Sequence, residues 1–262
     1  TEDTRGRNIA IGTLALSSQN SGADAYNIAI GHQAGTAMTT GTNNTLIGGL
    51  AGMDITDGTR NVAIGTLALT SETGSDRNVA IGNEALKTQD GASYNTAVGD
   101  SAGEMLTTGE DNVFVGGLAG DAITTGSQNV AVGMLALSGE DAHGRNTAIG
   151  YKALQDQDAG SDAYNVAVGY KAGGAVSTGN QNTFIGGSAG EAALTTETSV
   201  MIGKEAGSIT TSGSRFTFIG TTAGNAADYS GSNLTAIGFN AEPSAVGAGD
   251  EFTLGDSSVA TL

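Results

Sequence analysis

The chain has 262 residues, a formal charge of −17, 43 glycines, one proline, no tryptophan and no cysteine. Its ten Lys and Arg residues are scattered, so it lacks the basic patch that binding to nucleic acid or anionic lipid requires. Without cysteine it can have neither a disulfide framework nor a thiolate metal site, and no apolar run is long enough to predict a signal peptide or membrane insertion.

A short motif, N-x-A-I-G-x-x-A, recurs along the whole chain and is complete at residues 78–85. Its glycine occurs fifteen times, in steps of 17 residues with a step of 19 twice and of 18 once. Such a period marks identical units that bury their apolar faces only by stacking on their neighbours. We therefore predict an all-β fold, a parallel β-solenoid of about fifteen 17-residue coils.

Within each coil we count from the asparagine as position zero. Positions one and three are β-branched in almost every copy, as in Val79 and Ile81. Alternating β-branched residues share one face of a strand, so we expect these two positions to form the interior of each coil. Alanine at position seven is expected to fit the inside of the next corner.

Position two should then face outwards, where a strand in water would carry polar residues. It is apolar instead, which predicts that another subunit packs against it. We expect a homotrimer, assembled from intertwined or side-by-side chains. The predicted interface consists of Ala10, Ala29, Leu46, Ala63, Ala80, Ala97, Phe114, Ala131, Ala148, Ala167, Phe184, Met201 and Phe218.

The asparagines occupy position zero in the first eleven coils, from Asn8 to Asn182. Amide side chains that repeat at one place in a stack can pair as a ladder or cap the turn. We assign them a structural role.

A longer repeat of four coils overlies the short one and begins at Asn8, Asn78 and Asn146. Each block carries one tyrosine before its second coil: Tyr26, Tyr94 and Tyr164. Exposed aromatic rings suit sugar stacking, so these three residues are candidate glycan contacts. The alternative is that they pack against the edge of a neighbouring subunit.

The repeat changes towards the end of the chain, where Ser199, Phe216 and Leu234 replace the asparagine. Pro243 cannot donate a backbone hydrogen bond to the stack. We therefore predict a β-roll repeat domain at 1–240 and, at 241–262, a transition segment that ends in an altered last coil and leads to a further C-terminal element. Residues 2–8 parallel residues 140–146, so the chain is expected to open inside a spacer of a longer protein.

No residues suggest catalysis or a cofactor. His32 and His143 lie in distant coils, and Gly203-Lys204 lacks the rest of a phosphate loop. Asp156 and Asp158 approach the spacing of a calcium loop without completing it. We predict no catalytic, cofactor or metal site.

The coils resemble the YadA-like head repeats of trimeric adhesins, whose motif N-S-V-A-I-G-x-x-S has a shorter period. The segment 146–154, N-T-A-I-G-Y-K-A-L, is similar to repeats of bacteriophage tail fibre shafts. Residues 250–262 resemble the segment that runs into the self-cleaving intramolecular chaperone domain of phage fibres. The resemblance implies a left-handed β-roll in a homotrimer.

The expected function is that of a non-enzymatic fibre segment of a virion, or of another extracellular surface. It would extend a receptor-binding tip and contact a host cell-surface receptor or glycan. Two alternatives stay open: the head of a bacterial trimeric autotransporter adhesin, and a tailspike depolymerase that cleaves polysaccharide with paired carboxylates.

Overall fold

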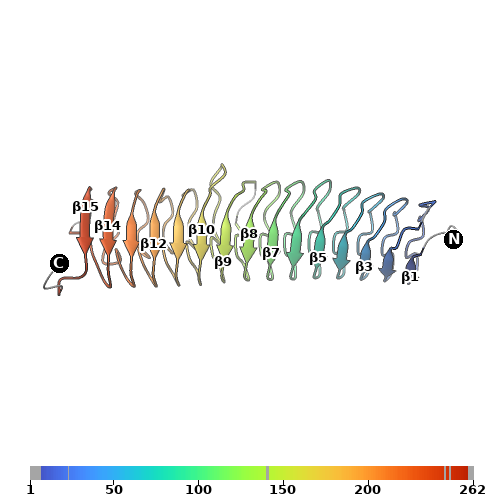
Figure 1. The fold of residues 1–262 in the computed structure, drawn as a ribbon, viewed down its shortest axis with the longest axis horizontal. Helices are drawn as coiled ribbons and strands as arrows, with labels where there is room; N and C mark the ends of the chain where they lie inside the picture. The colour runs from blue at the N-terminus through green and yellow to red at the C-terminus, as the bar shows by residue number, and fades with distance from the viewer. Residues whose placement is uncertain (1–6, 23, 140–141, 245, 248, 259–262) are drawn as a thin grey trace. The chain divides into compact units, whose positions relative to one another are not determined.

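A computed structural model confirms an all-β parallel β-solenoid of about 14 turns, with about 17 residues per turn and one strand in each repeat (Figure 1). The structure describes residues 7–22, 24–139, 142–244, 246–247 and 249–258. In this described part no helix is long and apolar enough to cross a membrane. The chain divides into two compact units, 1–129 and 130–262, which are taken separately below. The division falls inside the predicted repeat domain, and the predicted boundary at residue 240 stays a prediction.

The first unit holds seven parallel strands of three residues each. They are β1 (Ile9–Ile11), β2 (Ile28–Ile30), β3 (Thr45–Ile47), β4 (Val62–Ile64), β5 (Val79–Ile81), β6 (Thr96–Val98) and β7 (Val113–Val115). Each strand pairs with the next in register, so that Ala29 lies beside Leu46 and Ala80 beside Ala97. Equal positions of the repeat therefore form continuous columns.

The second unit continues the same pattern with eight strands. They are β8 (Val130–Val132), β9 (Thr147–Ile149), β10 (Val166–Val168), β11 (Thr183–Ile185), β12 (Val200–Ile202), β13 (Thr217–Ile219), β14 (Leu234–Ile237) and β15 (Glu251–Leu254). The predicted last coil is present as β15, which pairs in parallel with β14. Residues 259–262 of the chaperone-like segment lie outside the described residues.

The glycine after each strand is required by a close approach between turns. Gly82 has φ +143°, and a Cβ built on it would lie 2.1 Å from the carbonyl oxygen of Gly99 in the next turn. No side chain fits in that space, so glycine is the one residue that lets successive corners stack.

The predicted asparagine ladder is confirmed. The side-chain oxygen of Asn78 accepts the backbone N–H of Asn95 at 3.0 Å, and its amide donates to the carbonyl of Ala92 at 2.8 Å. Asn78 is fully buried. Asn78 thus satisfies two buried backbone groups and links its turn to the next.

Burial reverses the predicted direction of the two strand faces. Position two is fully buried inside a single chain in β2 to β13, whereas positions one and three are half-exposed or exposed. The alanines fit inside because the interior is narrow and is shared with the alanines of position seven, which are buried as predicted from Ala34 onwards.

Twelve of the thirteen predicted interface residues are therefore core residues of a single chain, and for these the prediction that their side chains meet a second subunit is wrong. The buried ones are Ala29, Leu46, Ala63, Ala80, Ala97, Phe114, Ala131, Ala148, Ala167, Phe184, Met201 and Phe218. Ala10, in the first strand, is exposed. Whether the chain forms a trimer stays a prediction.

The large residues of position two fill space that glycines leave at position eight. A Cβ on Gly120 would lie 2.6 Å from the Phe114 ring, and one on Gly103 would lie 2.7 Å from it. Where position two is Ala80, position eight is Leu86, which is fully buried. Large and small residues thus exchange places between the columns of positions two and eight, which keeps the core filled. This exchange explains why a large residue of position two recurs in each four-coil block.

Late in the second unit an aromatic cluster replaces the asparagine ladder. Phe216 stands at position zero and stacks on Phe218, with ring centroids 5.1 Å apart. Tyr229 packs on Phe218 at 6.0 Å. The cluster buries apolar area where earlier turns use buried hydrogen bonds.

Candidate interaction surfaces

The most extensive candidate surface is the outer sheet face, defined as positions one and three of the strands. Every one of these residues is Ile, Val or Thr from β1 to β14, and none is buried. Ile11 is 59% exposed, and Val113 is 37% exposed. Within each unit these residues form a continuous sheet surface of Ile, Val and Thr without a charged side chain.

In the first unit, Tyr26 and Tyr94 each lie two residues before a strand, directly ahead of the asparagine at position zero. Arg77 donates to the Tyr94 hydroxyl at 2.8 Å, and its guanidinium lies 5.3 Å from the ring centroid. Arg7 and Tyr26 repeat the arrangement, with a hydrogen bond of 3.0 Å and a separation of 5.6 Å. Arg7 also pairs with Asp24 at 3.2 Å. An arginine of the preceding turn thus holds each ring in place.

The second unit has one such pair. Arg145 donates to the Tyr164 hydroxyl at 2.8 Å, lies 5.4 Å from the ring centroid and forms an ion pair with Asp162. Tyr26, Tyr94 and Tyr164 are each about half exposed. Their assignment as glycan contacts stays a prediction.

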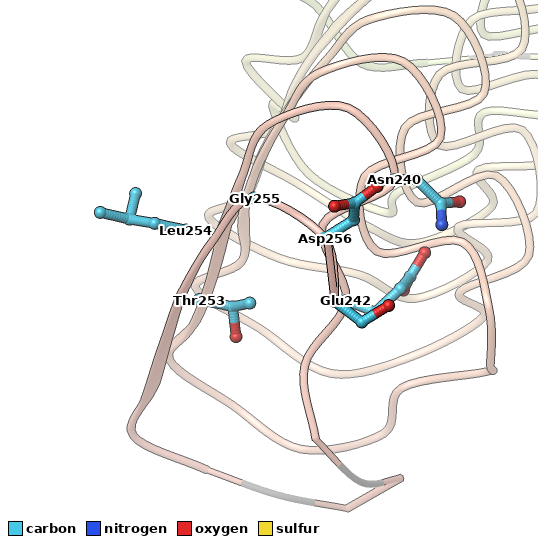
Figure 2. A pocket seen from close by; sticks show the side chains of 7 residues that line it. Asn240, Glu242, Thr253, Leu254, Gly255 and Asp256 are labelled. Carbon is cyan, nitrogen blue, oxygen red and sulfur yellow. The ribbon is translucent and has the colours of Figure 1, made fainter. Parts of the chain in front are cut away.

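A pocket of about 340 Å³ lies beside β14 and β15. Figure 2 shows Asn240, Glu242 and Asp256 turned towards one another there, while Leu254 points away from them. Glu242 accepts hydrogen bonds from the Tyr229 hydroxyl and the Asn225 backbone, and Asp256 accepts two from Ser258. Both carboxylates are therefore already engaged within the chain.

The pKa values at this end agree with that engagement. Burial raises the pKa of Tyr229, and the neighbouring Glu242 carboxylate raises it further, so the phenol stays a hydrogen-bond donor. Hydrogen bonds from Ser258 lower the pKa of Asp256. A lowered carboxyl pKa is the opposite of what a general acid near neutral pH requires.

Neither unit contains both of the histidines considered for chemistry. His32 is exposed in the first unit, and His143 belongs to the second. Among the described residues, no group of three or more His, Asp or Glu side chains could hold a metal ion, and this includes the turn with Asp156 and Asp158.

Sequence reasoning missed the outer sheet face as a surface and the arginine partners of the tyrosines. The second could have been found, because an arginine stands before the asparagine one turn ahead of each tyrosine.

Comparisons of the chain with protein-family models, with curated proteins and with solved structures give no match.

Proposed function

We propose that this chain is a non-enzymatic structural segment of an attachment fibre, assembled as a homotrimer through the outer sheet face. The observation that carries the proposal is the uncharged, β-branched surface formed by positions one and three. Exposed contiguous apolar patches of this kind mark association surfaces in soluble proteins.

A second copy of the same chain is the occupant that fits this surface best. The face is periodic along the chain, so only a partner with the same period can match it throughout. The chain carries a formal charge of −17, and none of that charge lies at positions one and three of β1 to β14. A threefold axis parallel to the direction in which the turns stack, and therefore perpendicular to the strands, would bring equal turns of three chains to equal heights and close the assembly.

The attachment role is supported by the sequence resemblance at residues 146–154 and 250–262. In this role the chain is part of a virion tail fibre, or of another extracellular surface, that extends a receptor-binding tip and contacts a host receptor or glycan. The left-handed coil belongs to the same proposal. Hydrogen-bonded columns along each unit give the stiffness that such a segment needs.

Two alternatives compete with this role. The head of a bacterial trimeric adhesin would use the same face for assembly. A depolymerase needs a pair of free carboxylates in a groove, and the carboxylates of the pocket beside β15 are engaged with other side chains.

The oligomeric state tests the proposal. Light scattering after size exclusion should give three times the chain mass for the unmodified protein. The double variant Ile64→Lys, Ile81→Lys should give the mass of one folded chain, since charges on this face cannot be packed against a second copy. The matched control Ser18→Lys, at an exposed position away from the strands, should remain a trimer. A monomeric unmodified chain at micromolar concentration would refute the proposal.

A further inference from the structure

Two exposed tyrosines that the proposed assembly does not use lie in the second unit. Tyr151 and Tyr170 stand at position five, after β9 and β10, and are 39% and 55% exposed. Their rings stack with centroids 5.5 Å apart and planes inclined by 16°. Neither hydroxyl makes a hydrogen bond within the described part of the chain.

The repeat shows that the fold does not require these rings. The equivalent pairs in the other two blocks are Thr13 with His32, and Asn83 with Asp100. The backbone turn is the same in each case, so the aromatic pair is a local addition.

The next turn leaves the position beside Tyr170 open. Position five after β11 is Gly187, and a Cβ built there would meet no atom within 4 Å. No side chain of that residue can cover the outer face of the Tyr170 ring. An exposed aromatic face beside an empty position is a stacking platform.

A polar groove of about 190 Å³ lies next to the platform. Its lining residues are Lys152, Gln155, Asp156, Lys171, Gly174, Ala175 and Glu191. The equivalents of Gly174 in the other blocks are Thr36 and Glu104, so the glycine removes a side chain that would stand in the groove.

Two lysines connect the platform with the groove. The amino group of Lys152 lies 5.5 Å from the Tyr151 centroid, and that of Lys171 lies 5.7 Å from the Tyr170 centroid. Lys171 also pairs with Glu191 at 3.0 Å. They are two of the four lysines in the sequence. With Asp156 and Glu191 the groove holds two charges of each sign, which cancel.

We propose that the tyrosine platform and this groove form a binding site for a neutral saccharide. One sugar ring stacks its C–H face on the outer face of Tyr170, and its hydroxyls exchange hydrogen bonds with Lys171 and Glu191, the charged groove residues of the same turn and of the next turn. The inference rests on the attachment role proposed above and names the class of glycan.

Size and charge restrict the ligand. The groove is smaller than the ~300–1,000 Å³ of ordinary ligand pockets, so it takes about one sugar ring. A strongly acidic chain repels polyanionic glycans, and the groove has no net positive charge to offset that repulsion.

The test uses the full chain on an array of neutral and anionic glycans, followed by calorimetric titration of the strongest ligand. We expect binding to neutral glycans. Tyr170→Ala and Gly174→Glu should each weaken binding at least tenfold. The glutamate is a conservative choice for the fold, because the equivalent turn carries Glu104. Phe239→Ala removes an exposed aromatic ring from position five of another turn and should leave affinity unchanged.

Absence of binding to every neutral glycan, tighter binding to a polyuronate, or unchanged affinity in both site variants would overturn the inference. The oligomeric mass is measured on the same samples. A trimer that binds no glycan would refute the saccharide site and leave the fibre assembly standing. A monomer that binds neutral glycans would refute the assembly and leave the site standing.

Discussion

In β2 to β13, both faces of the strands lack charged side chains, but one face is buried and the other is half-exposed or exposed. Position two is mostly alanine and is buried within one chain, whereas the larger β-branched residues of positions one and three face outwards. Hydrophobic bulk therefore does not indicate the interior of a thin solenoid. The space available does, because in β1 to β14 position two takes a large side chain only where position eight is glycine and otherwise takes alanine.

The largest contrast is expected from the same charge placed on the two faces. Ala80→Lys would bury an unpaired ammonium in the core at a cost of several kcal/mol, enough to unfold a typical domain. Val79→Lys places the charge on the half-exposed outer face and should change the free energy of unfolding of one chain by less than about 1 kcal/mol. Urea unfolding followed by circular dichroism measures both. Equal stability of the two variants would contradict the assignment of position two to the interior and position one to the outside.

The second-largest effect on stability is expected from the exchange of large and small residues between positions two and eight of the core. Phe114→Ala should cost about 3–5 kcal/mol because it opens a cavity over Gly103 and Gly120. Gly120→Leu alone should also destabilise, since the leucine meets the Phe114 ring. The double variant restores the Ala–Leu pair that other turns contain, as at Ala80 and Leu86, and should recover part of the loss. Simple additivity in this double-mutant cycle would argue against volume exchange.

The asparagine ladder should give a smaller loss. Asn78→Ala leaves the buried Asn95 N–H without a partner, at about 1–3 kcal/mol, and removes one of the two donors to the Ala92 carbonyl, which still accepts from Gln89. Asn78→Ser keeps an acceptor, as Ser199 does when it accepts the Phe216 N–H at 3.0 Å, and should cost less. Denaturant unfolding of both variants measures the difference, and equal losses would show that the ladder oxygen contributes nothing.

An ion pair on the outside should give the smallest effect. Burial raises the pKa of Glu191, but hydrogen bonds from Ser188 and Lys171 outweigh it and lower the pKa overall. Its contribution is therefore present above the ordinary glutamate pKa and is lost as the pH falls through the lowered value. Both side chains are 36% exposed, so Lys171→Met should cost less than about 1 kcal/mol at pH 7 and nothing at pH 2. A cost that persists at pH 2 would rule out the ion pair as its source.

The sequence predicted the solenoid, its period, the corner glycines and the asparagine ladder, because each follows from a residue type that repeats at a fixed place. The prediction of which strand face is buried was wrong. The alternation of residues along a strand assigns them to two faces. Because neither face carries charged side chains, the alternation does not indicate which face is inside. The width of the interior depends on how the opposite wall of the turn packs, as Leu86 and Gly103 show, and that wall has no simple alternation.

The candidate surfaces were predicted less well. Tyr26, Tyr94 and Tyr164 were found by their repetition, while their arginine partners lie one turn away and appear only when the turns are stacked. Tyr151 and Tyr170 do not recur in the other blocks, so a search for repetition passes over them. Gly174 indicates a groove only once the structure places it beside Lys152 and Lys171.

Thiol labelling tests the assignment of the two faces most directly, because the chain contains no cysteine. Ala80→Cys and Val79→Cys are each labelled with a maleimide over a dilution series of the folded protein. The buried cysteine at position 80 should stay unreactive at every concentration and react only after unfolding. The cysteine at position 79 should be protected at high concentration and become reactive as the assembly dissociates. Reactivity at position 80 that rises on dilution, with position 79 protected in the single chain, would contradict the assignment.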